Sequence, residues 1–320
     1  MTQPVTAVAL AAVHAARARL APIIEHTPIV RCQADPTGRV FLKLENLQPI
    51  GSFKIRPVGN AVLARPAASL KAGLYTCSSG NSAVAVAWLA QRLGIPAAAV
   101  VTDAAPEAKL ARLRALRARI REVSADEWWQ AVTACALPGE TGTYVDAVRD
   151  AAALAGDATL GIEILEQLPA VDAIFTPFGG GALACGIACA VRALNPQVKV
   201  IACELEGAQP FAAALRAGRV VQTESHPGFV SGVGFHTLLP EMWPLCRELI
   251  DGALTVSLAE VAGAIRVLAE GNKVIAEGAG AVPVAAALSG RHPYRRVCAV
   301  VSGGNLGNEA LTTILAGGIP

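Results

Sequence analysis

A lysine stands directly after the turn-forming residues Gly51, Ser52 and Phe53, and its type and position suit covalent chemistry. A primary amine can form an imine with an aldehyde, but a lysine at its ordinary pKa is protonated at neutral pH and is a poor nucleophile. Lys54 could therefore act in this way only in a partly dry, electropositive pocket. Because most lysines are solvated surface residues, this lysine alone does not establish a site.

Three other segments carry groups that could hold an anionic ligand. The sequence SSGNS at 78–82 lies between a short apolar run and an Ala/Val-rich run, a strand, turn and helix pattern whose amides could bind a carboxylate. The sequence GGGA at 179–182 has the same setting, so its amides could receive a phosphate. The sequence SGGN at 302–305 places a hydroxyl at the carboxyl end of an expected strand, where open α/β sheets bind ligands.

Together with FLKLENLQP at 41–49, these segments resemble the threonine/serine dehydratase and serine racemase family, pyridoxal-phosphate enzymes with the tryptophan synthase beta-like fold, fold type II. The resemblance runs from about residue 20 to 315, and the order and strand context of the motifs agree with it. It implies pyridoxal 5'-phosphate as cofactor. It also implies an ammonia-lyase (dehydratase) that eliminates water from a β-hydroxy amino acid such as threonine or serine, giving a 2-oxo acid and ammonia.

The resemblance implies a role for each matching residue. Lys54 would hold the cofactor and remove the substrate α-proton, Phe53 would pack beside the ring, and Ser302 would face the ring nitrogen. The residues expected to hold the phosphate are Gly179, Gly180, Gly181 and Ala182. The residues expected to hold the substrate carboxylate are Ser78, Ser79, Gly80, Asn81 and Ser82, of which Asn81 would also bind the ring hydroxyl. Gly232 and Glu277 match two further positions near the cofactor.

Several points of chemistry stay open within this family. Ser82 replaces a histidine that is usual there, so the preferred β-hydroxy amino acid is not defined. Ser79 matches the second acid–base group of serine racemases, which makes an amino-acid racemase the alternative activity, although the same serine could be a turn residue only. For Glu277 the alternative is a partner for a helix dipole. β-Replacement by a second nucleophile ranks lower, because such enzymes usually have TSGNT in the carboxylate loop.

Two interpretations lie outside this chemistry. The sequence GGGALA at 179–184 fits a dinucleotide fingerprint, with Glu204 as the ribose-binding acid of an NAD-dependent Rossmann oxidoreductase, but Lys54, Asn81 and Ser302 then have no role. The second interpretation is a non-enzymatic binding protein on the same fold. A divalent-cation site known in relatives would map to Glu204 and Pro210, and because a proline side chain cannot ligate a hard cation, no metal site is expected.

Short β-rich runs alternate with longer Ala/Leu-rich runs, which predicts an α/β fold with parallel sheets covered by helices. The expected strands are 40–44, 73–76, 97–102, 119–123, 142–145, 171–176, 198–203 and 296–301. Two domains are expected, each an open, mostly parallel twisted sheet flanked by helices: residues 1–72 and 149–320 as a large cofactor-binding domain, and residues 73–148 as a small mobile domain. The segment 218–256, rich in Pro and Gly, is expected to be loop around the active-site mouth.

Composition excludes few classes of protein but agrees with this reading. The 320 residues are 53% apolar and 16% charged, enough to bury large cores, and the net charge of +2 gives no general case for binding nucleic acid. The basic run 109–121 is expected to form an amphipathic helix. Long uncharged stretches are interrupted by polar residues, Pro or Gly, so no membrane partner is expected. Eight scattered cysteines predict reduced, buried thiols. The Ala-rich N-terminal residues 7–21 include His14, Arg17 and Arg19, unlike a signal peptide, so a cytoplasmic protein is expected. The expected partners are an amino acid substrate and, by resemblance only, a second copy in a homodimer.

Overall fold

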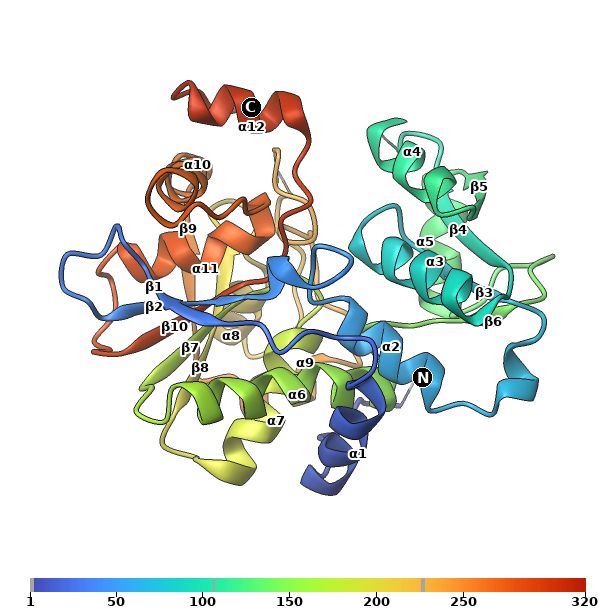
Figure 1. The fold of residues 1–320 in the computed structure, drawn as a ribbon, viewed down its shortest axis with the longest axis horizontal. Helices are drawn as coiled ribbons and strands as arrows, with labels where there is room; N and C mark the ends of the chain where they lie inside the picture. Colours follow the sequence, from blue (N-terminus) through green and yellow to red (C-terminus); the bar gives the residue numbers. More distant parts are fainter. Residues whose placement is uncertain (1–2, 106, 226–227) are drawn as a thin grey trace.

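Two separate β-sheets form the framework of the protein, whose computed structural model describes residues 3–105, 107–225 and 228–320. The strands of the larger sheet are β1 (Ile29–Arg31), β2 (Val40–Leu44), β7 (Ala173–Pro177), β8 (Lys199–Leu205), β9 (Gly252–Val256) and β10 (Val297–Val301). The strands of the smaller sheet are β3 (Leu74–Cys77), β4 (Ala97–Thr102), β5 (Arg119–Val123) and β6 (Thr143–Tyr144). The two sheets lie on opposite sides of the molecule, the larger on the left in Figure 1.

The larger sheet has the order β1-β2-β10-β7-β8-β9. Among its described strands β1 alone runs antiparallel, against β2, and the others are parallel to their neighbours. In the centre, Val297 of β10 lies opposite Val40 on one side and Ala173 on the other. Every residue of β7 and β10 is buried, as expected for parallel strands that are covered on both faces.

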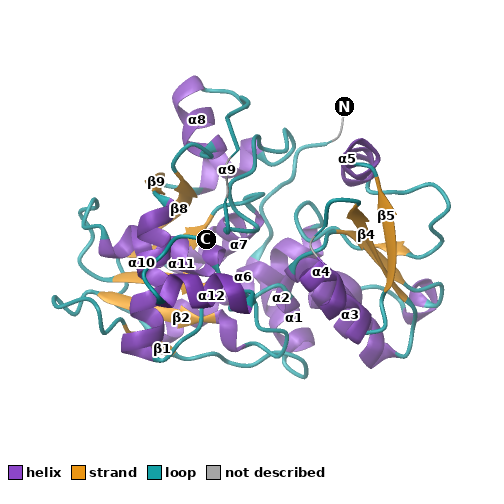
Figure 2. Ribbon diagram, turned by 90° about the horizontal axis from the view of Figure 1, so that it is seen from above, coloured by secondary structure: helices purple, strands orange, loops and turns teal. Residues whose placement is uncertain are grey.

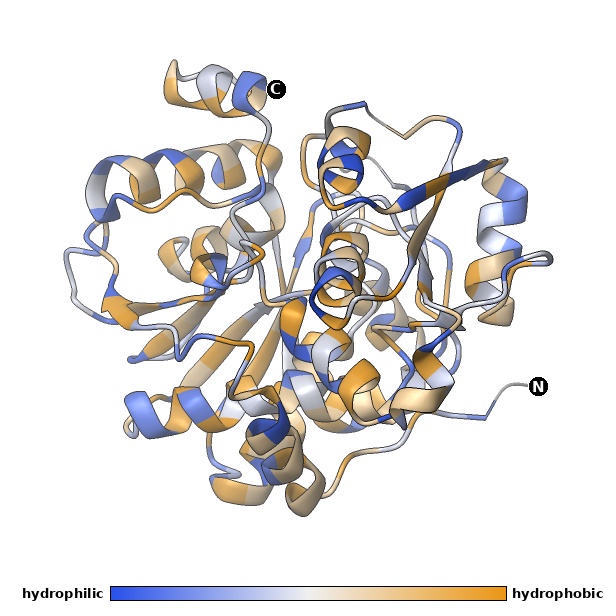
Figure 3. Cartoon of the chain, turned by 45° about the vertical axis from the view of Figure 1, so that its right-hand side comes forward, coloured by the Kyte–Doolittle hydropathy of each residue, from blue (hydrophilic) through white to orange (hydrophobic). Residues whose placement is uncertain are grey.

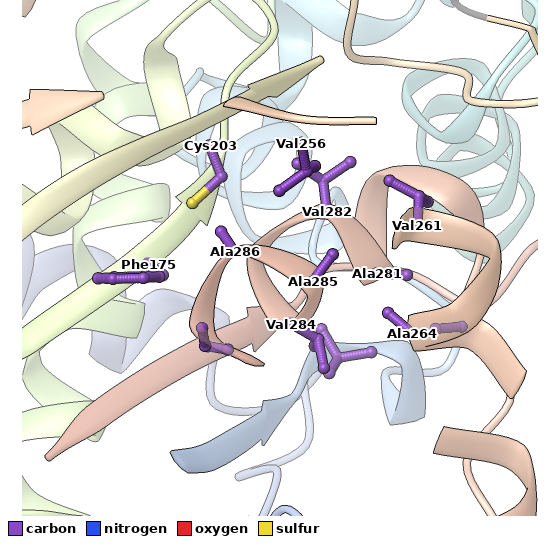
Figure 4. Close-up of a cluster of buried hydrophobic side chains, with 14 of the residues drawn as sticks. Phe175, Cys203, Val256, Val261, Ala264, Ala281, Val282, Val284, Ala285 and Ala286 are labelled. Atoms are coloured by element: carbon purple, nitrogen blue, oxygen red, sulfur yellow. The ribbon is translucent and has the colours of Figure 1, made fainter. Parts of the chain in front are cut away.

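Helices cover both faces of the larger sheet. One face carries α6 (Ala151–Gln167), α7 (Ala182–Leu194), α8 (Pro210–Ala217) and α9 (Trp243–Leu249), with α1 (Leu10–Leu20) packed on α6 and α7. The other face carries α10 (Leu258–Val267), the π-helical turn η3 (Leu268–Asn272), α11 (Gly278–Leu288) and α12 (Asn308–Leu315). Figure 4 shows the core on this second side, where Ala286 of α11 lies near Phe175 of β7 and Cys203 of β8. Hydrophobic colours run along the strands of this sheet in Figure 3.

The smaller sheet is parallel, in the order β5-β4-β3-β6, and has a core on each face. One core contains α3 (Asn81–Leu93), α4 (Glu107–Ala115) and α2 (Ile55–Leu63), and the other contains α5 (Ala125–Ala134). Helix α2, flanked by the short turns η1 (Glu45–Leu47) and η2 (Ala67–Leu70), packs on both α3 and α6. It therefore joins the two halves of the molecule, as Figure 2 shows from above.

The predicted fold class is confirmed, and all eight predicted strands are present. The prediction of loop for 218–256 is wrong in part, because this segment contains α9 and β9, the edge strand that pairs with β8; its residues 226–227 lie outside the described residues. The strand β1 was also missed. The helix expected in the basic run ends at Ala115, and Ile120 belongs to β5. In the described part of the chain, none of the helices has the length and apolar character needed to cross a membrane.

Candidate active site

Lys54 stands at the N-cap position of α2, and the turn before it is held by the segment that follows β10. The Phe53 N–H donates to the Ser302 carbonyl at 2.9 Å. Gly51 has a φ of +73°, and a Cβ at this position would come within 2.5 Å of the Asn305 side chain. Glycine is therefore required for this close approach. The lysine motif and the serine motif, about 250 residues apart in the chain, form one unit at the carboxyl end of the larger sheet.

Asn81, the first residue of α3, joins this unit to the smaller sheet. Its Nδ2 donates to Oε1 of Glu277 at 2.6 Å, and its Oδ1 accepts from Nδ2 of Asn305 at 2.6 Å. The same Asn305 nitrogen donates to the carbonyl of Ile50 at 3.1 Å. Segments distant in the sequence therefore converge around one amide side chain.

The glycine-rich loop connects β7 to α7. Gly181 is the N-cap residue of α7 with a φ of +87°, and no side chain caps this helix. The backbone amides of its first turn, which starts at Ala182, are therefore open to an anion. A Cβ on Gly179 would lie 2.2 Å from the carbonyl oxygen of Gly232, so the loop and Gly232 are in close contact and no side chain fits between them.

The SSGNS loop connects β3 to α3 and is half-buried along its length. Gly80 is the N-cap residue of α3, again without a side-chain cap, and its N–H donates to Oγ of Ser78 at 3.1 Å. Within the described ranges, the hydroxyls of Ser79 and Ser82 make no hydrogen bond to the protein. The loop thus presents free hydroxyls and amides beside Asn81.

Burial lowers the pKa of the Lys54 amine below its ordinary value, against the opposing charges of Asp157, Asp146 and Glu277. Its Nζ lies 4.7 Å from the centre of the Phe53 ring. The sequence left open whether this pocket is electropositive; in the structure the charges that affect Lys54 most are acidic. The partly dry environment alone makes this amine a better nucleophile than a surface lysine.

Glu277 is buried at the N-cap position of α11, but its carboxylate accepts from Asn81 rather than from an amide of its own helix. Burial raises the pKa of Glu277 to about 7, against the hydrogen bond from Asn81 and the charges of Arg112 and Lys109. The side chain of Glu277 therefore binds Asn81 and does not cap α11. A group with this pKa exchanges protons near neutral pH.

A buried network of charged side chains fixes the first turn of α2. Arg56 donates to Glu45 at 2.7 and 2.9 Å and to Glu163 at 2.7 and 2.9 Å, and it also contacts Thr159 at 3.1 Å. Lys43 adds a bond of 2.8 Å to Glu163. All of these side chains are buried. Because Arg56 follows Lys54 by two residues, this network holds the lysine backbone in place.

The contacts bring together Lys54, Phe53, Asn81, Glu277 and Ser302, and separately the glycine loop with Gly232. No contact within the described residues ties Ser79 or Ser82 to the other groups. The roles of Asn305 and Asp157 were not predicted from the sequence. The end of the SGGN motif could have indicated Asn305, and an acid within the apolar run AAALAGDATLG could have indicated Asp157.

Glu204, the acid on which the nicotinamide alternative depends, serves another purpose. Its two carboxylate oxygens accept from the N–H groups of Phe211 and Ala212 at 2.8 and 2.9 Å, so it caps α8, and it is fully buried. Pro210 lies in the first turn of this helix. The absence of a metal site at these residues stays a prediction.

Known proteins match this chain over nearly its whole length. The family described as pyridoxal-phosphate dependent enzyme matches residues 20–303. An L-threonine ammonia-lyase of Thermotoga maritima is 37% identical over 286 residues, which cover 88% of this chain and 71% of that protein. A serine racemase of Oryza sativa subsp. indica is 32% identical over 305 residues, which cover 91% of this chain and 89% of that protein. The structure of maize serine racemase matches with a TM-score of 0.89 and 30% identity over 98% of both chains.

Proposed function

Because the chain belongs to the pyridoxal-phosphate-dependent enzyme family, we propose that it is an ammonia-lyase acting on a β-hydroxy amino acid such as threonine or serine. It would eliminate water and give a 2-oxo acid and ammonia. The relative from Thermotoga maritima, named an L-threonine ammonia-lyase, supports this reaction. The observation that carries the proposal is the joining of the Lys54 turn, Ser302 and Asn81 in one unit, with a lysine amine whose pKa is lowered by burial.

The donor groups of the site fit pyridoxal phosphate. Lys54 supplies an amine for the aldehyde, the open amides of 179–182 suit the phosphate, and Ser302 offers a hydroxyl to the ring nitrogen. Asn81 keeps one amide hydrogen after its bond to Glu277, because an amide nitrogen carries two, and this hydrogen is available to the ring hydroxyl. The bound cofactor supplies an electron sink for the substrate α-carbon.

The residues of this chain carry out binding, orientation and proton transfer. The amides and hydroxyls of 78–82 bind the substrate carboxylate and direct the α-C–H bond toward Lys54. The Lys54 amine, freed when substrate binds, accepts the α-proton and returns it to the β-hydroxyl, which leaves as water; acid–base help of this kind contributes roughly 10²–10⁴-fold. Ser302 has no negative charge to hold a proton on the ring nitrogen, which favours elimination over transamination.

Release of 2-oxo acid tests this function. The purified protein is incubated with threonine, serine and bulkier or acidic β-hydroxy amino acids, and the 2-oxo acid is quantified as its hydrazone. We expect release from at least one of these substrates and near-complete loss in Lys54→Ala. A cofactor-loaded protein that releases no 2-oxo acid from any of them contradicts the proposal.

Racemisation of a serine-type amino acid is the second candidate. It needs an acid–base group on the opposite side of the substrate from Lys54, and the free hydroxyl of Ser79 supports that role. The relatives from rice and maize are named serine racemases. Chiral analysis of serine after incubation with the wild type and Ser79→Ala tests it: racemisation that Ser79→Ala abolishes while elimination persists favours this candidate, and no D-serine from the wild type excludes it.

We also propose that residues 1–72 and 149–320 form a large cofactor-binding domain and residues 73–148 a small mobile one. The core between the smaller sheet and α5 lies wholly within 73–148 and supports this division, whereas the core on the other face also includes α2 residues of the large domain. Two contacts of α4 reach the other part: Lys109 Nζ lies 3.1 Å from Ser231 Oγ, and Arg112 Nη2 lies 2.8 Å from the Ile50 carbonyl. Movement would break these contacts and leave the core around α5 intact. Hydrogen exchange in α4 should slow when substrate binds, and unchanged exchange argues against movement.

The assembly and location complete the proposal. Seven of the eight cysteines are buried and all are free, which suits a reducing compartment such as the cytoplasm. The homodimer rests on the family resemblance. Light scattering coupled to size exclusion should give twice the mass of the chain, and the mass of a single chain contradicts the dimer.

A further inference from the structure

Asp157 is a buried acid that the proposed reaction does not use. It lies on α6, has 0% exposure, and neither of its carboxylate oxygens has a hydrogen-bond partner among the described residues. A Cβ on the preceding Gly156 would come within 2.4 Å of the Arg56 carbonyl oxygen, and a Cβ on Gly186 of α7 would come within 2.5 Å of Asp157 Cβ. Asp157 is thus enclosed between α6, α7 and the start of α2. An unpaired buried carboxyl group costs folding free energy, so its presence calls for a functional explanation.

Asp157 lies on α6 where Gly156 closely approaches the Arg56 carbonyl, two residues after Lys54, so Lys54 is the amine at this helix start that can compensate its charge. Burial raises the pKa of Asp157 to about 7; the charges of Lys54 and then Arg56 oppose this rise, whereas Glu45 adds to it. Cys185 of α7 is a further titratable group near Asp157. The effect is reciprocal, because Asp157 has the largest charge effect on Lys54.

The other charged groups already have partners. Arg56 is bonded to Glu45 and Glu163. The two other acids that affect Lys54 are bonded as well, Asp146 to Arg149 at 2.6 Å and Glu277 to Asn81 at 2.6 Å.

Lys54 itself has no carboxylate within ion-pair distance in the described chain. Asp157 and Lys54 are therefore both unpaired, and each can compensate the charge of the other.

We propose that Asp157 is a positioning residue that acts through Lys54: its buried negative charge stabilises the ammonium form of Lys54 and so sets the proton affinity of the amine that serves as base. The inference rests on the proposed role of Lys54. Burial by itself lowers the proton affinity of the Lys54 amine, but a base must retain the proton that it removes from the substrate. A nearby buried carboxylate offsets burial without blocking the amine by a direct hydrogen bond.

Chemical labelling of the full-length protein freed of cofactor tests this without relying on activity. Lys54 is labelled with trace acetic anhydride across a range of pH, and its acetylation is measured by peptide mass spectrometry against exposed Lys71 as internal standard. Only the neutral amine reacts. In Asp157→Asn, Lys54 should be labelled several-fold more than in the wild type at neutral pH. Thr176→Val, a change at a buried polar residue of β7 that lies outside the Arg56 network and removes no charge, should leave the labelling unchanged.

A labelling profile of Asp157→Asn that superposes on the wild type overturns the inference, and so does an equal increase in Thr176→Val. Asp157→Ala, which also removes the charge and is smaller, replaces Asp157→Asn if the latter does not fold. In the loaded enzyme, the acid limb of the kcat profile should move to lower pH in Asp157→Asn. Borohydride trapping separates this inference from the proposed function: a trapped Lys54 with unchanged labelling rejects the inference alone, and an untrapped Lys54 rejects the function.

Discussion

Replacement of Arg56 by methionine tests the buried charge network that holds the start of α2. Methionine keeps much of the apolar packing but makes none of the bonds to Glu45 and Glu163. Lys43 continues to neutralise Glu163 at 2.8 Å. Glu45 retains an uncharged partner, Thr27 at 2.6 Å, so its charge is left buried without compensation. Removing one partner of a buried ion pair costs about 3–5 kcal/mol.

This cost is a large part of the whole stability of a protein, which is about 5–15 kcal/mol. At about 1.5 °C per kcal/mol for a chain of 320 residues, the Tm of Arg56→Met should fall by roughly 4–8 °C in a melt followed by circular dichroism. The matched control is Arg17→Met, which removes a bond of 2.6 Å to Glu166 between side chains that are 38% and 47% exposed. Such a surface pair contributes about 0–1 kcal/mol. Equal Tm values for the two variants would refute the reasoning.

Three further changes give specific outcomes. Gly179→Ala should reduce cofactor affinity, because its Cβ would lie 2.2 Å from the Gly232 carbonyl oxygen. Gly263→Ala, with open space around its Cβ, should bind the cofactor as the wild type does. Equal cofactor Kd values for the two variants contradict phosphate binding by the loop at 179–182. Ser302→Asp should shift the products from elimination toward transamination, and an unchanged product ratio argues against the proposed contact with the ring nitrogen. Burial raises the pKa of Asp157 to about 7, so this carboxyl group binds a proton in the native state that it releases in the unfolded state, and its contribution to stability falls as the pH rises from about 4 to about 7. An asparagine side chain does not titrate, so the free energy of unfolding of Asp157→Asn relative to the wild type should increase by roughly 2–3 kcal/mol between about pH 5 and about pH 8, as measured by urea unfolding. A difference between the two proteins that does not change with pH contradicts the raised pKa of Asp157.

The main site segments were predictable because each follows a short apolar run. Ser302 follows β10, the loop at 179–182 follows β7, and the loop at 78–82 follows β3. Carboxyl ends of parallel strands face one edge of a sheet, so local patterns were sufficient to predict ligand-binding loops there. The resemblance, rather than these patterns, supplied the role of each residue.

Other features depend on contacts that no local pattern reveals. Arg56 and Glu163 are separated by 107 positions, and each lies within an apolar stretch that predicts only a buried helix. The strand β9 has five residues within a segment rich in Pro and Gly, and pairing with β8 decides its conformation. The surroundings of Lys54 could not be predicted from the sequence, because burial depends on the whole fold; in the structure burial lowers the pKa of the amine in spite of its acidic neighbours.

The covalent attachment of the cofactor to Lys54 can be measured directly. The active protein is reduced with borohydride, digested and analysed by mass spectrometry. The account predicts that the peptide containing Lys54 carries the mass of the reduced cofactor and that the visible absorbance of the protein is lost on reduction. An active enzyme in which Lys54 is unmodified, or in which another lysine carries the cofactor, contradicts it.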